Sequence, residues 1–442
     1  MEILIKILQF ILSLSILIII HECGHFFFAK LFKTRVEKFY LFFNPWFSLF
    51  KIKKGETEYG VGWIPLGGYV KISGMIDESM DLEQMKQPPQ PYEFRSKSTW
   101  QRLLIMLGGV LVNFVFALII YVAILYVWGE NYLPLKNAKY GIAVDSLAYD
   151  AGLRSGDYIT SVDNVEVDNF NAVITTVLIN QAKTIQVLRD NQKVNIILPK
   201  NFINALINKK QEVILPRVPF LIGAFAKKSP GKEAGLKIGD RLIAIEGKKA
   251  EFFDEFKTQA LRHKNKVLKI TVDRKGKSVD ISANVPESGI IGIAQDFDLS
   301  KFFVLKNIRY GFFESIPAGI SKGFGRLTDY IKSFKLVFSS TAKGYESLGG
   351  FMTMGSIFPS VWDGYLFWSL TAFLSIILAF MNILPIPALD GGYILFLLYE
   401  MITGRKPSDK FLEYAQLTGL IIIVAILLYA NLNDVHRFFF RK

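Results

Sequence analysis

The sequence predicts a polytopic α-helical membrane protein with about four transmembrane helices, a glycine-rich β-hairpin and two copies of a small domain outside the membrane. Three observations lead to this class. The 442 residues are 51% hydrophobic with a mean hydropathy of +0.30, several long runs carry no charge, and one short motif occurs twice. Soluble domains are usually less apolar, so we looked first for membrane spans.

Four apolar runs are long enough to cross a hydrocarbon core about 30 Å thick, which takes roughly 20 helical residues. They lie within residues 1–30, 101–128, 361–392 and 415–442. A cleaved signal peptide is the alternative for the first run. No small-residue cleavage site follows that run, however, and His21, Glu22 and His25 interrupt it. We therefore interpret all four runs as spans.

The distribution of basic residues predicts the orientation of the spans. Lysines and arginines such as Lys33, Arg35 and Arg102 lie close to span ends in the loop between the first and second runs, which is therefore expected to be cytoplasmic. Residues 129–360 then lie outside, and the basic turn around Arg405 lies inside. The carboxyl tail with Arg437 departs mildly from this rule. The net charge of +13 is scattered and lacks a recognition motif, so nucleic acid is not an expected partner.

The outside segment contains an internal repeat. The stretch 150–159, D-A-G-L-R-S-G-D-Y-I, returns at 233–242 as E-A-G-L-K-I-G-D-R-L. The A-G-L-x-x-G-D signature resembles that of PDZ domains in bacterial envelope proteases, which take an extended peptide beside a glycine-containing loop. The candidate peptide-binding residues are Gly141, Ile142, Ile222 and Gly223. A role as spacer or size filter without a peptide ligand remains equally open.

Two further segments have a distinctive composition. Residues 58–75 alternate between polar and apolar and are rich in glycine, which predicts a hairpin or bent sheet. Residues 301–360 mix aromatic with basic residues, which is typical of helices that lie on a membrane surface. The single cysteine, Cys23, excludes an internal disulfide.

The first span contains the candidate metal-binding and catalytic residues. His21-Glu22-Cys23-Gly24-His25 matches the zinc-binding pattern H-E-x-x-H. In a helix, histidines four residues apart share one face and can bind one ion, while the glutamate is displaced toward water as a general base. Ionisable side chains in a lipid-facing helix would each cost about 2.5 to 3.5 kcal/mol. These residues are therefore expected to face protein, water or metal.

A catalytic zinc site usually has three protein ligands and one open position. The other histidines, His263 and His436, lie far from the first span in the predicted topology. Asp390 follows the third span, which runs in the same direction as the first, so the two histidines and Asp390 should lie at a similar depth. Pro385 and Pro387 break the helix before Asp390. Asp390 is thus the predicted third ligand.

These motifs together resemble the site-2 protease family of intramembrane zinc metalloproteases, in the bacterial branch with two PDZ domains that cleaves anti-sigma factors. The resemblance covers nearly the whole chain in order. It rests on H-E-x-x-H at 21–25, P-L-G-G-Y-V at 65–70, G-V-L-V-N-F at 109–114, the two repeats, and N-x-x-P-x-x-x-L-D-G-G at 382–392. One departure is Phe351, where related proteins would have proline.

The resemblance implies a zinc-dependent protease of the bacterial inner membrane, with a site near the cytoplasmic side and PDZ domains outside. It implies that His21, His25 and Asp390 bind Zn²⁺ and that Glu22 is the base. The segment 58–75 would be a membrane-reentrant hairpin. Residues implied to position the substrate are Asn382, Asn113, Gly67 and Gly68. Implied partners are transmembrane substrates of the anti-sigma-factor type, membrane lipid and peptide ligands of the PDZ domains.

Two other classes of function compete with the protease. An inert scaffold would use the PDZ pair alone, yet it would have no need of His21, Glu22, His25 and Asp390 in lipid. A zinc transporter also places histidine and aspartate in spans, but it needs neither a general-base glutamate nor peptide-binding domains. Metal flux into vesicles separates these cases.

Overall fold

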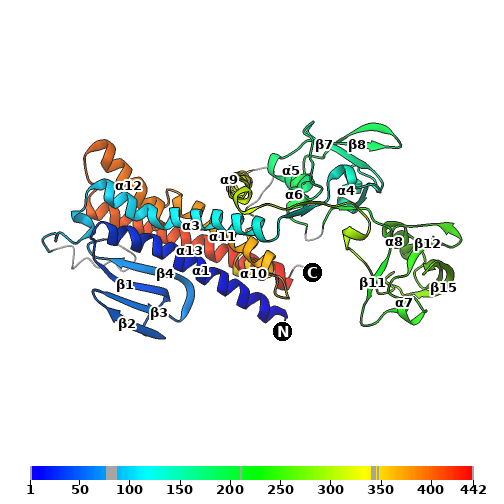
Figure 1. Ribbon diagram of the computed structural model, residues 1–442, viewed down its shortest axis with the longest axis horizontal. Helices are drawn as coiled ribbons and strands as arrows, with labels where there is room; N and C mark the ends of the chain where they lie inside the picture. The colour runs from blue at the N-terminus through cyan, green and yellow to red at the C-terminus, as the bar shows by residue number, and fades with distance from the viewer. Residues whose placement is uncertain (1, 76–86, 210–211, 340–344, 346–347, 441–442) are drawn as a thin grey trace. The chain divides into compact units, whose positions relative to one another are not determined.

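The computed structural model describes residues 2–75, 87–209, 212–339, 345 and 348–440. These residues form two compact units (Figure 1). The membrane unit comprises Met1–Gly129, Arg309–Phe334 and Tyr345–Lys442, and the repeat unit comprises Glu130–Ile308 and Lys335–Gly344.

Four described helices of the membrane unit are long and apolar enough to cross a membrane, as the sequence predicts. They are α1 (Glu2–Leu31), α3 (Thr99–Val127), α11 (Gly364–Ile383) and α13 (Asp409–Val435), the last continued by a π-helical turn at His436–Phe440. Side chains cap their first turns: Ser98 forms a capping box with Gln101 before α3, and Asp363 accepts from the Leu366 N–H before α11.

Helix α3 is the centre of the membrane unit, because α1, α11 and α12 (Asp390–Thr403) all pack against it. The ion pair between the buried Arg102 and the partly buried Glu400, 2.5 Å apart, joins α3 to α12. Helix α9 (Phe312–Val337) also contacts α3, where Gly319 lies against Val122. The short helix α10 (Phe351–Ser356) is tied to α13 by hydrogen bonds between Thr353 and Asp434.

The glycine-rich segment forms part of a four-stranded sheet, in agreement with the sheet alternative of the prediction and not with the hairpin. Its strands are β1 (Val36–Phe43), β2 (Phe50–Lys54), β3 (Thr57–Val61) and β4 (Ile64–Ile72), in the order β2-β3-β1-β4. The predicted hairpin over 58–75 is wrong in its pairing, because β1 lies between β3 and β4, parallel to β3 and antiparallel to β4. Strand β4 also packs against α1, so one outer strand of the sheet borders the helix that carries His21 and His25.

The repeat unit contains two copies that share a three-stranded antiparallel arrangement and a separate pair of strands, while the first copy has an additional helix and the second an additional short strand. The first copy has β6 (Ile142–Val144), α4 (Ser146–Asp150), β7 (Tyr158–Val162), α5 (Ala172–Asn180), β8 (Thr184–Arg189), β9 (Gln192–Ile197), α6 (Phe202–Ile207) and β10 (Ile214–Pro216). The second has β11 (Ile222–Phe225), α7 (Pro230–Glu233), β12 (Arg241–Ile245), β13 (Lys248–Lys249), α8 (Phe253–Arg262), β14 (Lys266–Arg274), β15 (Lys277–Val285) and β16 (Ile293–Gln295). Strands β5 (Glu130–Tyr132) and β17 (Lys306–Ile308) pair with each other and bring the two ends of residues 130–308 together.

A buried aspartate explains the G-D pair of the repeated motif. Asp157 accepts two hydrogen bonds from Arg189, at 2.7 Å each, and Asp240 accepts the equivalent pair from Arg274, at 2.8 and 2.7 Å. Each arginine also donates to the carbonyl of the motif's first glycine, Gly152 or Gly235. In Asp240 burial raises the pKa, but the hydrogen bonds from Arg274 and from the Lys237 N–H lower it more, so the pKa lies below its usual range. The motif therefore fastens its turn to the arginine at the end of β8 or β14, the strand that pairs with the one directly after the motif.

Candidate metal centre

The H-E-x-x-H motif lies entirely within α1, so the helix required by the pattern is present. His21 and His25 face the same side, with their Nε2 atoms 3.2 Å apart. Both histidines and Glu22 are buried. Since the three side chains face protein rather than lipid, the cost of placing ionisable groups in this span is reduced.

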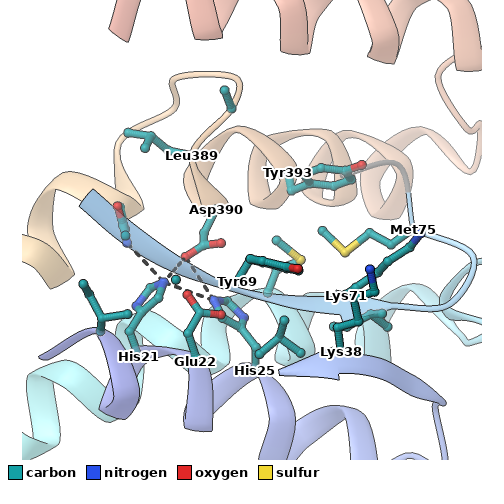
Figure 2. Close-up of a pocket in the computed structure, with 18 of the residues that line it drawn as sticks. His21, Glu22, His25, Lys38, Tyr69, Lys71, Met75, Leu389, Asp390 and Tyr393 are labelled. Carbon is teal, nitrogen blue, oxygen red and sulfur yellow. Dashed lines mark hydrogen bonds and ion pairs between the residues drawn. The ribbon is translucent and has the colours of Figure 1, made fainter. Parts of the chain in front are cut away.

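Asp390 is brought to the histidines by the break between α11 and α12. Helix α11 ends at Ile383, and α12 begins at Asp390 after the segment with the two prolines. Asp390 Oδ2 lies 3.2 Å from His21 Nε2 and 3.4 Å from His25 Nε2 (Figure 2). These three residues are the group of potential metal ligands that the described part of the chain brings within 4.8 Å of one another.

The geometry of this group fits a zinc ion. Zinc–ligand bonds of about 2.0 to 2.1 Å in a tetrahedron place neighbouring ligand atoms roughly 3.3 to 3.4 Å apart. The three separations here are 3.2, 3.2 and 3.4 Å. In addition, Asp390 Oδ2 is buried and has no hydrogen-bond partner. A cation between the three atoms would satisfy that oxygen, and two imidazoles with one carboxylate are a common ligand set for catalytic zinc.

The second nitrogen of each histidine has its own partner in α3. His25 Nδ1 lies 2.9 Å from the Ile105 carbonyl, and His21 Nδ1 lies 3.2 Å from Asn113 Nδ2. Asn113 Oδ1 is buried and without a partner. Turning the Asn113 amide by 180° would let that oxygen accept from a protonated His21 Nδ1, which leaves Nε2 for a metal. Sequence analysis named Asn113 through the resemblance alone and missed Ile105, since a backbone carbonyl has no sequence signal.

Glycines make the close approach of α1 and α3 possible. A Cβ atom on Gly24 would lie 2.2 Å from the Gly108 carbonyl oxygen, and one on Gly109 would lie 2.4 Å from His25 Nε2. Any side chain at Gly109 would therefore push into the imidazoles. Small residues that let helix backbones touch are common in membrane helix pairs, and here they also give the histidines their space.

Glu22 borders a pocket of about 550 Å³ and is not one of the three clustered ligand residues. The pocket is lined on one side by β4, where a Cβ on Gly68 would lie 3.6 Å from Glu22 Cγ. The Val70 backbone also hydrogen-bonds to Glu22. Glu22 thus lies between the metal ligands and the strand, where it can receive a proton from a water in the pocket.

Asn382 and Gly67 line the same pocket. Asn382 is in the last turn of α11, with its Nδ2 atom 3.2 Å from His21 Nε2, and so it faces the ligand group. Gly67 has a φ of 157°, and a Cβ there would lie 2.8 Å from the Phe43 ring. The structure thus brings the predicted catalytic and ligand residues together with Asn382, Gly67 and Gly68 around one pocket, whereas Asn113 is buried beside His21 and does not line it.

The four candidate peptide-binding residues belong to the repeat unit and not to this pocket. Backbone N–H groups of Gly141, Ile142 and Ile222 donate to carbonyls of their own repeat, those of Ala138, Asp157 and Asp240 respectively. Gly223 lies against Asp296. These donors are therefore already used within the repeats. Another glycine-containing loop, Gly289–Gly292, precedes β16 and lies beside Leu261 of α8. The sequence contains one sign of this loop that the prediction did not use, the Ile-Gly-Ile triplet at its end.

Comparison with known proteins identifies relatives along nearly the entire chain. A model of peptidase family M50 matches residues 9–426. The regulator of sigma-E protease RseP of Escherichia coli is 27% identical over 454 residues, covering 97% of this chain and 98% of that protein. Its Salmonella typhimurium counterpart is 26% identical, covering 99% and 100%. A third relative, from Vibrio cholerae, carries the name of a zinc metalloprotease. It is 27% identical, and the match covers 99% of each chain.

Proposed function

Since the chain belongs to peptidase family M50 and is an intramembrane zinc metalloprotease, we propose that it hydrolyses peptide bonds within or near the transmembrane segments of single-span membrane proteins. Zinc is the cofactor, held by His21, His25 and Asp390. Glu22 is the general base. The observation that carries this proposal is the meeting of those four residues with the outer strand β4 around one pocket.

In the proposed hydrolysis, the metal and the side chains of the protein have separate roles. Bound zinc supplies Lewis-acid chemistry that polarises the scissile carbonyl and makes water a better nucleophile near neutral pH. Glu22 takes the proton from that water and passes it to the leaving amine. The Ile105 carbonyl and Asn113 orient the histidines, which raises their basicity as ligands. Asn382 faces His21 and orients the substrate beside it.

Strand β4 gives the substrate a place to unfold. A transmembrane helix keeps its carbonyls in internal hydrogen bonds, so it must unwind locally before hydrolysis. An unwound segment that pairs with the edge of β4 recovers those bonds in the form of added β-structure. Because β4 pairs with β1 on one side and lines the pocket on the other, its second edge is directed at Glu22.

The natural substrates are proposed to be anti-sigma-factor-like proteins with one span, with remnant signal peptides as a second group. Relatives that carry the name regulator of sigma-E protease RseP support this choice. The proposed location is the bacterial inner membrane, with the repeat unit outside and the metal centre near the cytoplasmic face. Support for this orientation is the basic loop after α1, which contains Lys33 and Arg35.

The proposal is tested with purified protein in detergent and a model single-span substrate. Cleavage is expected to stop when a chelator such as 1,10-phenanthroline removes zinc, and to return when zinc is added back, because the two histidines and Asp390 hold a catalytic ion. Cleavage that persists in a protein shown to be free of metal would disprove the mechanism. Zinc flux into vesicles without peptide hydrolysis would instead indicate a transporter.

The two repeats are proposed to be PDZ domains that control access of full-length substrates. The three antiparallel strands that they share, β7-β8-β9 and β12-β14-β15, and the Asp–Arg pair of each motif support two copies of one domain. Peptide binding and size filtration both remain compatible with this role. For peptide binding, the Gly289–Gly292 loop beside α8 replaces Ile222 and Gly223 as the candidate in the second repeat.

Removing the repeats is expected to leave the chemistry intact and to relax this control. Tyr132 and Lys306 are paired neighbours in β5 and β17, so residues 133–305 can be replaced by a two-residue Asn-Gly turn. The shortened enzyme should cleave a truncated substrate at close to the wild-type rate and should also cleave the full-length form without prior trimming. Loss of all cleavage in a protein that still binds zinc would contradict this expectation.

A further inference from the structure

The pocket of the metal centre has a second polar end, formed by Lys38 of β1 and Lys71 of β4. Both lysines line the same pocket as His21 and Glu22. In Figure 2 the two lysines lie together, away from the group of His21, His25 and Asp390, with Tyr69 between. Neither lysine has a role in the hydrolysis described above, although both reach the space that a substrate would occupy.

A β-bulge gathers these charges on one face of the sheet. Val36 pairs with Ile72 and Lys38 pairs with Lys71, so Glu37 is an extra residue in β1. Bulges of this kind redirect side chains and are common next to active sites. Residues directly opposite each other in antiparallel strands have Cβ atoms about 5 Å apart. The two lysine side chains therefore start from neighbouring positions on one face of the sheet, where like charges directly opposite each other are unfavourable.

Glu37 is a carboxylate of the described residues that lies beside Lys71. Glu37 Oε2 is 3.7 Å from Lys71 Nζ, and Ser73 donates a 2.7 Å hydrogen bond to the other Glu37 oxygen. Lys71 is largely buried, with 17% of its side chain exposed. Within the described residues, Lys38 has no carboxylate at ion-pair distance. Lys38 thus lines the pocket without an ion pair to any carboxylate that the described part of the chain contains.

The spacing of residues along β4 gives the distance between the two lysines and the scissile bond. Gly68 lies beside Glu22, and Lys71 is three residues further along the strand. At about 3.3 Å per residue this is roughly 10 Å. A substrate strand paired with the β4 edge would therefore bring a side chain about three residues from the scissile bond to Lys38 and Lys71. Because both lysines line the pocket that Glu22 borders, a substrate side chain is favoured over a lipid headgroup as the occupant.

We infer that Lys38 and Lys71 form a specificity subsite that favours an acidic side chain of the substrate about three residues from the scissile bond and disfavours a basic one. This inference rests on the proposed peptidase function. It adds a charge preference that the metal ligands and Glu22 do not supply. A partly exposed ion pair changes an equilibrium or a rate by up to roughly fivefold. The difference between an acidic and a basic substrate is larger, because attraction is then replaced by repulsion.

The test uses the full-length enzyme in neutral detergent at low salt, with a model single-span substrate whose cleavage site is mapped. Single residues two to four positions on each side of the scissile bond are changed in turn to Asp, Asn or Lys. At one position we expect the Asp substrate to be cleaved with a kcat/KM at least about fivefold above that of the Lys substrate. The preference should weaken as salt is added.

Three variants assign the preference to this subsite. Lys38→Glu should reverse the order of the Asp and Lys substrates, and Lys38→Met should remove the preference while the Asn substrate is still cleaved. The matched control is Lys53→Glu on the exposed strand β2 of the same sheet, which makes the same charge change outside the pocket and should leave the preference unchanged.

Failure of the inference can be distinguished from failure of the proposed function. If the wild-type enzyme cleaves the Asp, Asn and Lys substrates equally at every position, the subsite is disproved and the peptidase function stands. If it cleaves none of them, the peptidase function fails and the inference with it. If substrate charge has no effect but Lys38→Glu alters the response of the rate to added phosphatidylglycerol, the lysines bind a lipid phosphate and the inference is overturned.

Discussion

Glu22→Gln is expected to lower the rate of cleavage of a model transmembrane substrate by about 10² to 10⁴-fold, which is the usual contribution of a general base. The glutamine keeps the size of the side chain and can still hydrogen-bond, but it cannot accept a proton from water. Glu22 is not one of the three clustered ligand residues, so zinc content should remain close to that of the wild type. Kinetics in detergent and metal analysis of the same preparation measure both quantities.

The matched control for this variant is Glu56→Gln. Glu56 is another glutamate of the membrane unit, in the turn between β2 and β3, with 64% of its side chain exposed. Its substitution should leave both cleavage and zinc content unchanged. A wild-type rate in Glu22→Gln would exclude Glu22 as the base. Loss of zinc from Glu22→Gln would show instead that Glu22 is a ligand, in conflict with the geometry of His21, His25 and Asp390.

Asp390→Ala is expected to lose most of its zinc and, with it, all measurable cleavage. Two histidines alone leave the site one ligand short. Loss of a residue that only orients a metal ligand lowers metal affinity by roughly 10 to 100-fold. Loss of the ligand Asp390 itself should lower the affinity for zinc by more than that. Metal analysis after dialysis against a weak chelator measures this loss. Asp390→Asn, which retains one ligand oxygen without the charge, should give an intermediate zinc content.

Asp363→Ala is the control for effects on helix ends. Asp363 and Asp390 both lie at the start of a helix, and Asp363 caps α11 through a 2.8 Å hydrogen bond to the Leu366 N–H. Losing that cap should cost about 1 kcal/mol of stability and no zinc. If Asp390→Ala binds as much zinc as Asp363→Ala, the assignment of the third ligand is wrong.

Local patterns were sufficient to predict the spans and the candidate ligands. The four apolar runs gave four helices because a continuous apolar run has few alternatives to a helix in lipid. His21 and His25 share a face because their spacing matches one helical turn. Asp390 could be proposed because Pro385 and Pro387 end α11 near the depth at which the histidines lie. The repeat was likewise visible as a recurring string of residues.

Contacts between distant residues were decided by the tertiary structure alone. No local pattern showed that β1 would separate β3 from β4, because strand pairing depends on which strands meet in space. The same reason kept Ile105 hidden as the partner of His25, 80 residues away. It also hid the pairing of Lys38 with Lys71, since the bulge at Glu37 that aligns them exists only once the two strands are joined. The sequence thus determined which residues carry the chemistry, and tertiary packing determined their partners, because hydrogen bonds and ion pairs of this kind form between segments that only folding brings together.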